Sequence, residues 1–254
     1  MGNREIISKL RVFIGAKLRS INAAIFYRWI LFLKSRPLAV SQKSAMVFSP
    51  HQDDETLGCG GMIALKRSLG VPVEVVFLTD GRYGRPEWIA PEKITEVRQQ
   101  EAVNALSVLG IATSEAHFLN QIDGSLQNLP NEQRQHIVDC LAEHLKSFMP
   151  EEVYVPHRKD VHGDHEATYK LVEEAIAASG IQVEVLQYPI WMFWQNPLSF
   201  GLDSEDMTSV YRLGIDAVKD KKRQAIATYR SQLPGLPSGL LKNFFLPYEI
   251  FFKN

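Results

Sequence analysis

Cysteine is scarce in this 254-residue sequence, which contains only Cys59 and Cys140. Two cysteines cannot build a disulfide framework, so a reducing compartment is expected. Net charge is almost absent as well, because 28 Lys and Arg residues stand against 29 Asp and Glu residues. A chain with a formal net charge of −1 lacks the excess positive charge of a nucleic-acid-binding domain. These shortages argue against a disulfide-stapled secreted domain and against a nucleic-acid partner.

Long hydrophobic runs are missing too. No uncharged stretch reaches the ~18–20 apolar residues that a helix needs to cross a bilayer. The nearest candidate, AIFYRWILFL, is interrupted by Arg28. No small-residue cleavage site follows a clean apolar core, as it would in a secretory signal. The sequence therefore predicts a cytoplasmic protein.

The N-terminal segment differs from the rest of the chain. Residues 1–36 carry eight basic residues and a single acidic one, Glu5. Apolar residues recur at helical spacing, at Ile7, Leu10, Ile14, Leu18, Ile21 and Ile25. Two interpretations stay open: an amphipathic helix in peripheral contact with an anionic membrane surface, or a helix packed on its own domain or on a second subunit of a homo-oligomer. We therefore divide the chain into a helical extension, residues 1–40, and one domain, residues 41–254.

Strand-like and helix-like segments alternate from residue 44 onward. Short runs rich in β-branched residues predict strands at 45–49, 73–81, 115–119, 152–156 and 183–191. Longer segments between them predict helices at 60–70, 90–110, 131–149 and 165–180. Such alternation is typical of a Rossmann-like α/β fold, with a mostly parallel sheet and helices on both faces. The aromatic C-terminus, LLKNFFLPYEIFFKN, is expected to close the core or to form a dimer contact.

Two loops concentrate the polar chemistry. The first, SPHQDDETLGCGG, follows the strand at 45–49, and the second, HRKDVHGDH, follows the strand at 152–156. In an open parallel sheet, ligands bind beyond the carboxyl ends of the strands. Because both loops leave the sheet at that edge, we expect them to meet in space.

The donors in these loops suit a divalent metal ion. His51 and Asp54 are three residues apart, so they point the same way in a helical turn, whereas Asp53 points elsewhere. His165 would complete a His–Asp–His set, and His162 could reach the same cavity. Adjacent carboxylates at a strand end repel each other unless a cation offsets their charge. The sequence predicts a Zn²⁺ site with a position left for water, and Fe²⁺, Mn²⁺ or Co²⁺ would fit the same donors.

PHQDDETLGCGG together with HGDH resembles the PIG-L/LmbE-like family of zinc-dependent N-acetylglucosaminyl deacetylases. The likeness spans roughly residues 44–250 and includes LTDG, RQQEAVNALSVLG, FLNQIDGSL and KRQAIATYRSQ. Gln52 and Gly163 stand where proline is commonest in that family. Neither position supplies a ligand, so these departures concern the rigidity of the loops.

The resemblance implies a reaction and a set of roles. It implies an enzyme that removes an N-acetyl group from an N-acetylglucosamine-type sugar, with Zn²⁺ held by His51, Asp54 and His165. Asp53 would act as general base, and a protonated His162 would stabilise the oxyanion or compete with Asp53 as the acid. Two further carboxylates would orient the histidines, Asp164 and Asp160.

The substrate contacts have competing interpretations. The resemblance places Arg98 and Asp123 at positions that bind sugar hydroxyls of a small-molecule or glycoconjugate substrate. From the residues alone, Arg98 could equally form a surface ion pair with Glu101, and Asp123 could simply form a turn. In YPIWMFW and YRSQ, the aromatic residues and Gln232 are further candidates for the pocket wall.

Two rival functions stay open. The first keeps the metal and changes the bond, as in an amidase for a thiol-sugar conjugate or another acyl amide. The second is a membrane-associated binding protein with a degenerate site, against which the intact ligand set argues.

Overall fold

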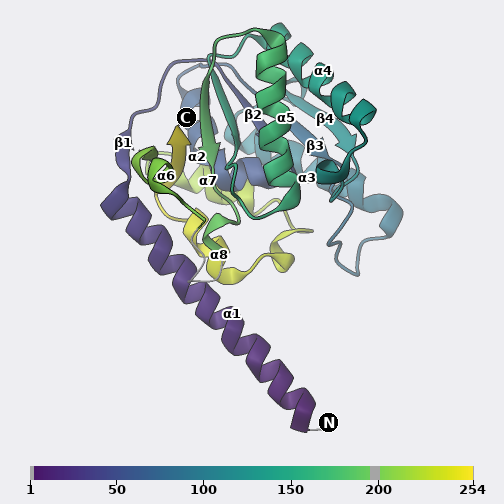
Figure 1. Ribbon diagram of the computed structural model, residues 1–254, viewed down its shortest axis with the longest axis vertical. Coiled ribbons are helices and arrows are strands. Elements are labelled where there is room, and N and C mark those ends of the chain that lie inside the picture. Colours follow the sequence, from purple (N-terminus) through teal and green to yellow (C-terminus); the bar gives the residue numbers. More distant parts are fainter. Residues whose placement is uncertain (1–2, 195–200, 254) are drawn as a thin grey trace.

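The structure, a computed structural model, describes residues 3–194 and 201–253, with side chains from Lys17 onward. An eight-stranded sheet is covered by helices, and a long N-terminal helix projects from this body (Figure 1). The predicted α/β class with a mostly parallel sheet is confirmed. The side chains of Ile7, Leu10 and Ile14, which belong to the apolar residues at helical spacing in the N-terminal segment, lie outside the described residues.

The strands follow the order β1-β7-β8-β6-β5-β2-β3-β4 across the sheet. Among the strands of the described residues, β8 alone runs antiparallel to its neighbours. The C-terminal aromatic stretch forms this strand between β6 and β7, so it completes the sheet. The bounds are β1 (Arg36–Leu38), β2 (Ala45–Ser49), β3 (Val73–Thr79), β4 (Ala116–Gln121), β5 (Glu152–Pro156), β6 (Glu184–Tyr188), β7 (Val210–Gly214) and β8 (Tyr248–Lys253).

Eight α-helices lie in the described part of the chain: α1 (Asn3–Trp29), α2 (Asp54–Ser68), α3 (Ile94–Leu109), α4 (Asn131–Phe148), α5 (Gly163–Ser179), α6 (Ser204–Thr208), α7 (Lys219–Ile226) and α8 (Ser238–Phe244). A π-helical turn, η1 (Ile30–Lys34), continues α1. Short 3₁₀ turns join the other elements: η2 (Pro91–Lys93), η3 (Thr113–Glu115), η4 (Leu126–Asn128), η5 (Met192–Trp194) and η6 (Leu233–Gly235).

Helix α2 begins six residues earlier than the sequence predicts, at Asp54 instead of residue 60. Glycine weakens a helix by about 1 kcal/mol relative to alanine, so the run GCGG does not favour one. Close packing overrides this preference, because a Cβ atom at Gly58 would overlap the ring of Tyr188. The early start places Asp54 in the first turn of α2, at the edge of the sheet.

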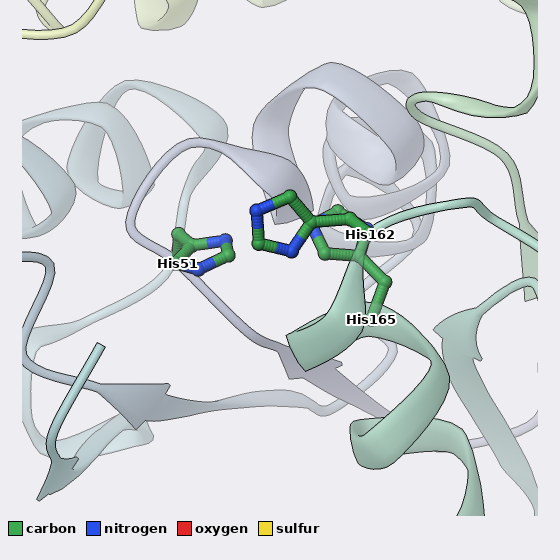
Figure 2. Close-up of side chains that lie close together, drawn as sticks. All are labelled: His51, His162 and His165. Carbon is green, nitrogen blue, oxygen red and sulfur yellow. The ribbon is translucent and has the colours of Figure 1, made fainter. Parts of the chain in front are cut away.

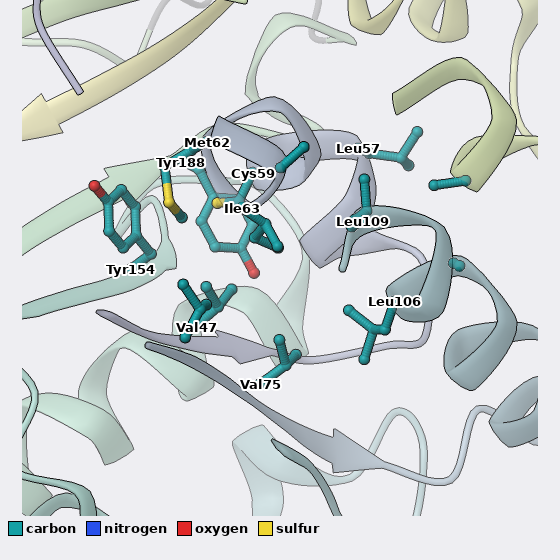
Figure 3. Packing of buried hydrophobic residues seen from close by; sticks show 14 of the residues in the cluster. Val47, Leu57, Cys59, Met62, Ile63, Val75, Leu106, Leu109, Tyr154 and Tyr188 are labelled. Atoms are coloured by element: carbon teal, nitrogen blue, oxygen red, sulfur yellow. The ribbon is translucent and has the colours of Figure 1, made fainter. Parts of the chain in front are cut away.

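Two apolar layers hold the sheet between its helices. On one face, α2, α3, α7 and α8 pack over the sheet in a cluster that includes Val47, Val75 and Tyr188 (Figure 3). Cys59 is fully buried in this cluster, so it is a core residue rather than a metal ligand. On the other face, α4 and α5 cover the same strands. These layers fix the carboxyl edge of β2 and β5, where the two polar loops emerge.

A third cluster attaches the end of α1 to the body. Phe26, Tyr27, Ile30 and Leu31 are buried against η5, β7 and β8. Tyr27 and Phe26 both meet the ring of Phe193 edge to face, with centroids 5.1 and 5.6 Å apart. The interpretation that this segment packs on its own domain therefore holds for its C-terminal part. Within residues 3–194 and 201–253, no helix is long and apolar enough to cross a membrane.

Candidate metal centre

The two polar loops meet because β2 and β5 are adjacent and parallel, with Val47 opposite Tyr154. His51 follows β2, whereas His162 caps the N-terminus of α5 and His165 lies in its first turn. Figure 2 shows the three imidazole rings gathered between the loop and the helix. Their centroids lie 5.0 Å (His51–His162), 5.4 Å (His51–His165) and 4.9 Å (His162–His165) apart. Side chains that are distant in sequence thus share one site.

The carboxylate of Asp54 lies between two of these rings. Its Oδ2 atom is 3.1 Å from Nδ1 of His51 and 3.2 Å from Nε2 of His165. Burial opposes ionisation of Asp54, but the adjacent histidines outweigh it and lower the pKa of this carboxyl well below its usual range. The structure therefore brings together the three side chains that the sequence analysis assigned to the metal, with an ionised carboxylate at the centre.

His165 is oriented for ligation by Asp160, whose Oδ2 lies 2.7 Å from Nδ1 of the ring. With the proton on Nδ1, Nε2 carries a lone pair, and this buried atom makes no hydrogen bond among the described residues, although Oδ2 of Asp54 lies 3.2 Å away. Burial lowers the pKa of His165, but Asp54 and Asp160 outweigh it and raise the pKa to about 9. A metal ion would compete with that proton for Nε2, and the donor set fits a divalent cation.

Asp160 also organises the chain beyond β6. Its carboxylate accepts backbone hydrogen bonds from Ile190 (2.9 Å), Trp191 (3.0 Å) and Met192 (2.9 Å). The predicted strand at 183–191 therefore ends at Tyr188, because the chain turns around this carboxylate. Trp191 becomes part of the cavity wall as a result.

His51 has two further carboxylate neighbours. Its Nε2 atom lies 3.2 Å from Asp164 and 3.2 Å from Asp123. Asp164 is fixed by backbone N–H groups of Gly124 (2.7 Å) and Leu126 (3.1 Å), so it orients His51 as Asp160 orients His165. His51, Asp123 and Asp164 form a second group close enough to hold a cation. Asp123, which the resemblance assigned to substrate, thus lies at the candidate metal centre, and its contact with substrate stays a prediction.

A cavity of about 280 Å³ opens beside these groups, with Asp53 and His162 in its wall. Asp53 is 7% exposed, and burial together with the charge of Asp54 raises its pKa well above the usual range. A carboxyl group with a raised pKa can accept and return a proton. Its position in the wall is what a general base beside the metal requires.

His162 can donate a hydrogen bond from Nε2 of its ring. Its Nδ1 atom accepts the backbone N–H of Asp164 at 3.3 Å, which leaves the proton of a neutral ring on Nε2. Burial, followed by the neighbouring His165 and His51, lowers the pKa of His162. This environment favours the neutral imidazole over the protonated form that the resemblance implies.

Arg98 lies in the cavity wall, not on the surface. Only 5% of the residue is exposed, and its guanidinium donates a hydrogen bond to the carbonyl of Gly81. Its buried Nε has no partner among the described residues. Glu101 instead accepts hydrogen bonds from the backbone and hydroxyl of Ser231, at 2.8 and 2.6 Å. The surface ion pair with Glu101 is therefore wrong, while contact of Arg98 with substrate stays a prediction.

Amide side chains stabilise both loops where the sequence departs from proline. Gln52 donates to the carbonyl of Thr79 at 2.6 Å, and its own backbone carbonyl accepts from the amide of Gln232. A Cβ atom at Gly163 would lie 2.7 Å from the amide of Gln127, so glycine allows that approach. The loops are thus held by packing and hydrogen bonds that the sequence pattern did not indicate.

The structure sorts the remaining candidates for the cavity wall. Trp191 of YPIWMFW and Gln232 of YRSQ both line the cavity, and Tyr83, from the loop after β3, lines it too. Tyr229, a candidate for the wall, is buried and donates to Glu55 instead. Val161 has φ = 63°, which is uncommon for a β-branched residue, and it precedes His162 directly. Strained backbone of this kind gathers at functional sites, but local sequence does not reveal it.

Comparison with known proteins identifies related chains. The sequence model of the family described as "PIG-L: GlcNAc-PI de-N-acetylase" matches residues 46–176, just over half of the chain. The probable N-acetyl-alpha-D-glucosaminyl L-malate deacetylase 2 of Bacillus subtilis is 28% identical over 199 residues, which cover 77% of this chain and 86% of that protein. The 4-oxalmesaconate hydratase of Pseudomonas putida is 29% identical over 147 residues, 55% of this chain and 54% of that protein.

Among solved structures, the conserved protein TT1542 from Thermus thermophilus superposes with a TM-score of 0.62 at 28% identity, over 79% of this chain and 84% of that one. The family match, the shared fold and the convergence of the PHQDDE and HGDH loops agree with the resemblance that the motifs indicated. This chain belongs to the PIG-L deacetylase family.

Proposed function

We propose that this protein is a zinc-dependent N-deacetylase acting on an N-acetylglucosamine-type sugar or glycoconjugate. One observation carries the proposal: the Asp54 carboxylate lies between His51 and His165, while Asp53 faces the adjoining cavity. This is the division of labour that metal-assisted amide hydrolysis requires, with one carboxylate for the ion and its neighbour for the proton.

His51, Asp54 and His165 would hold the ion. Two nitrogens and one carboxylate oxygen are a donor set that Zn²⁺ accepts, with a position left for water or substrate. When bound, the ion would supply Lewis-acid polarisation of the acetamide carbonyl and a lowered pKa for its water. Asp160 and Asp164 would fix the orientation of the two imidazole rings, since each carboxylate itself accepts hydrogen bonds from backbone N–H groups.

Asp53 and His162 would handle the proton and the oxyanion. Asp53 would accept the proton of the attacking water, because its raised pKa favours the protonated product of that transfer. The same carboxyl would return the proton to the departing amine. His162 would donate its Nε2–H to the carbonyl oxygen as negative charge develops there. A neutral His162 suffices for that donation, which removes the need for an imidazolium.

The cavity wall supports an amino-sugar substrate. Arg98 offers a buried guanidinium whose Nε is unpartnered among the described residues, and Asp123 offers a carboxylate beside the metal centre. Tyr83 and Trp191 add aromatic surface that can lie against a sugar ring. These groups fit hydroxyls and one apolar face, which is the surface that a pyranose presents.

An acetate-release panel tests the proposal. Purified protein with one equivalent of Zn²⁺ should release acetate and a free amine from at least one N-acetylglucosamine derivative. Removal of the general base in Asp53→Asn should lower the rate by about 10²–10⁴-fold. His136→Asn, on the exposed side of α4, is the matched control.

The hydratase relative and the amide alternatives define the contrary outcomes. Addition of water to 4-oxalmesaconate, the substrate named for the hydratase relative, with no acetate released from any sugar, would replace the proposal with a hydratase. Release of another acyl group, with acetamides untouched, would replace it with a different amidase. Neither hydrolysis nor hydration at stoichiometric metal would favour a binding protein.

A further inference from the structure

Helix α1 has apolar residues on two opposite sides. The side that holds Ala23, Phe26 and Tyr27 is buried against the body. Leu18, Ile21 and Ile25 are 57%, 50% and 62% exposed. Residues spaced by three, four and seven positions share one helical face, so these three form a stripe that points away from the domain. The interior of the protein therefore accounts for one side of the helix only.

The exposed stripe continues through the end of α1 into η1. Trp29, Phe32 and Leu33 are 37%, 59% and 73% exposed. We call Leu18, Ile21, Ile25, Trp29, Phe32 and Leu33 the apolar stripe. A contiguous set of large apolar side chains on a soluble surface marks an interaction site, whereas scattered single residues do not. Figure 1 shows the N-terminal part of α1 extending beyond the body.

Positive charge borders the apolar stripe. At 100° per residue, Lys17 and Arg28 fall on one flank of the stripe and Arg19 on the other, and all three are exposed. Lys34, also exposed, stands over the ring of Trp29 at 5.2 Å. The sequence contains no acidic residue from position 6 to position 52. An apolar band between basic flanks matches the boundary between acyl chains and anionic headgroups.

We propose that the apolar stripe of α1 and η1 is a peripheral membrane anchor, whose partner is the surface of a bilayer that contains anionic lipid. The helix would lie in the plane of the interface, since no helix among the described residues is suited to cross the bilayer. A second copy of this chain fits less well. A two-fold pairing would set the basic flanks of one helix near those of the other, with no acidic residue nearby in sequence to offset them.

The anchor is joined directly to the cavity wall. Helix α1 packs against η5 and α8, and a Cβ atom at Gly239 of α8 would overlap Ser20 of α1. Cavity residue Trp191 immediately precedes η5, and cavity residue Leu236 lies just before α8. A helix on the membrane would therefore hold the cavity near the lipid surface. Contact between the cavity and a membrane-held substrate is a consequence that rests on the proposed function. The membrane anchor itself does not rest on it.

Vesicle flotation with the full chain tests the anchor. Vesicles of phosphatidylcholine with about 30% phosphatidylglycerol should carry the protein upward, and phosphatidylcholine alone should carry much less. The triple variant Leu18→Gln/Ile21→Gln/Ile25→Gln should bind the anionic vesicles at least tenfold more weakly. Gln keeps high helix propensity and all three positions are exposed, so the fold should persist. Leu69→Gln/Met149→Gln, at exposed apolar positions elsewhere, is the matched control.

A second variant tests the charge. Lys17→Glu/Arg19→Glu/Arg28→Glu should lose the preference for anionic vesicles, and about 1 M salt should weaken wild-type binding relative to about 0.1 M. Equal flotation of the wild type and the triple Gln variant would overturn the proposal, as would failure of the wild type to float with anionic vesicles. If light scattering shows that the wild type is a dimer and the triple Gln variant a monomer, and the wild type does not bind vesicles, the stripe would instead be assigned to contact with a second copy.

Acetate release from a soluble acetylated sugar separates this proposal from the proposed function. The Gln variant should hydrolyse such a substrate as the wild type does, because α1 contributes no group to the metal centre. Loss of flotation with intact hydrolysis supports the anchor. Flotation without hydrolysis of any acetamide would leave the anchor standing and remove the deacetylase.

Discussion

Replacement of Asp160 by asparagine should damage both the stability of the fold and the metal centre. One carboxylate accepts hydrogen bonds from three consecutive backbone N–H groups and faces Nδ1 of His165 at 2.7 Å. An asparagine keeps one acceptor oxygen, so the oxygen shared by Trp191 and His165 would become an NH₂ group that faces two donors. Asp160→Asn therefore removes two charge-assisted hydrogen bonds at a fully buried position.

The expected loss follows from those two bonds. Hydrogen bonds to a charged group contribute about 1.5–3 kcal/mol each, so the free energy of unfolding should fall by about 3–6 kcal/mol. For a chain of this size, such a change lowers Tm by roughly 10 °C. Without its carboxylate partner, His165 loses its fixed tautomer, and metal affinity should fall about 10–100-fold.

Two measurements check this prediction. Urea unfolding followed by circular dichroism, with EDTA present, isolates the stability of the metal-free chain. Competition with a chromophoric chelator then measures metal affinity under conditions where the variant is folded. Asp139→Asn, at an exposed position on α4, is the matched control and should change neither quantity. A loss below about 1 kcal/mol together with wild-type metal affinity would refute the reasoning, since two buried charged hydrogen bonds cannot be that weak.

Three further outcomes are expected. Arg98→Lys should lower kcat/KM for acetate release by about 10–100-fold, because a buried charged donor to substrate is worth about 1.5–3 kcal/mol; initial rates equal to wild type would remove Arg98 from the substrate site. Gly58→Ala should destabilise the fold by about 2 kcal/mol in urea unfolding, because its methyl group would overlap Tyr188, whereas Gly201→Ala, with open space around it, should stay within about 0.5 kcal/mol. Burial opposes ionisation of Asp206, but its basic partners outweigh burial and lower the pKa of this carboxyl group. The carboxylate therefore stabilises the fold above pH ~4 and loses that effect as pH falls. Asp206→Asn should lower the free energy of unfolding by about 2 kcal/mol at pH 7, and a loss that stayed constant down to pH ~3 would contradict the assignment.

Local sequence was sufficient for the parts of the site that lie on two short loops. The spacing of His51 and Asp54, and of His162 and His165, marks donors that share a turn, and strand order at a parallel edge brings the loops together. The early start of α2 could not be read in the same way. Its glycines argue against a helix locally, and side chains from distant segments explain them: a Cβ atom would overlap Tyr188 at Gly58 and Ile215 at Gly61.

The missed features depend on contacts between distant segments. Nothing near Asp160 in sequence indicates that its carboxylate will receive three N–H groups from residues 190–192. The sequence therefore offered the aromatic residues of YPIWMFW only as candidates for the pocket wall, whereas the turn around Asp160 places Trp191 in that wall. The strands β7 and β8 escaped for a similar reason, because β8 enters the middle of the sheet antiparallel to both neighbours after the βα alternation has ended.

The central claim is that two loops from distant parts of the chain hold one divalent ion. Elemental analysis of protein purified with metal, and titration of the apo protein with Zn²⁺, measure this most directly. The account predicts one tightly bound ion per chain, with binding lost in both His51→Asn and His165→Asn and retained in His136→Asn. Full stoichiometric binding by either of the first two variants would show that the two loops do not share an ion, and the proposed mechanism would fall with it.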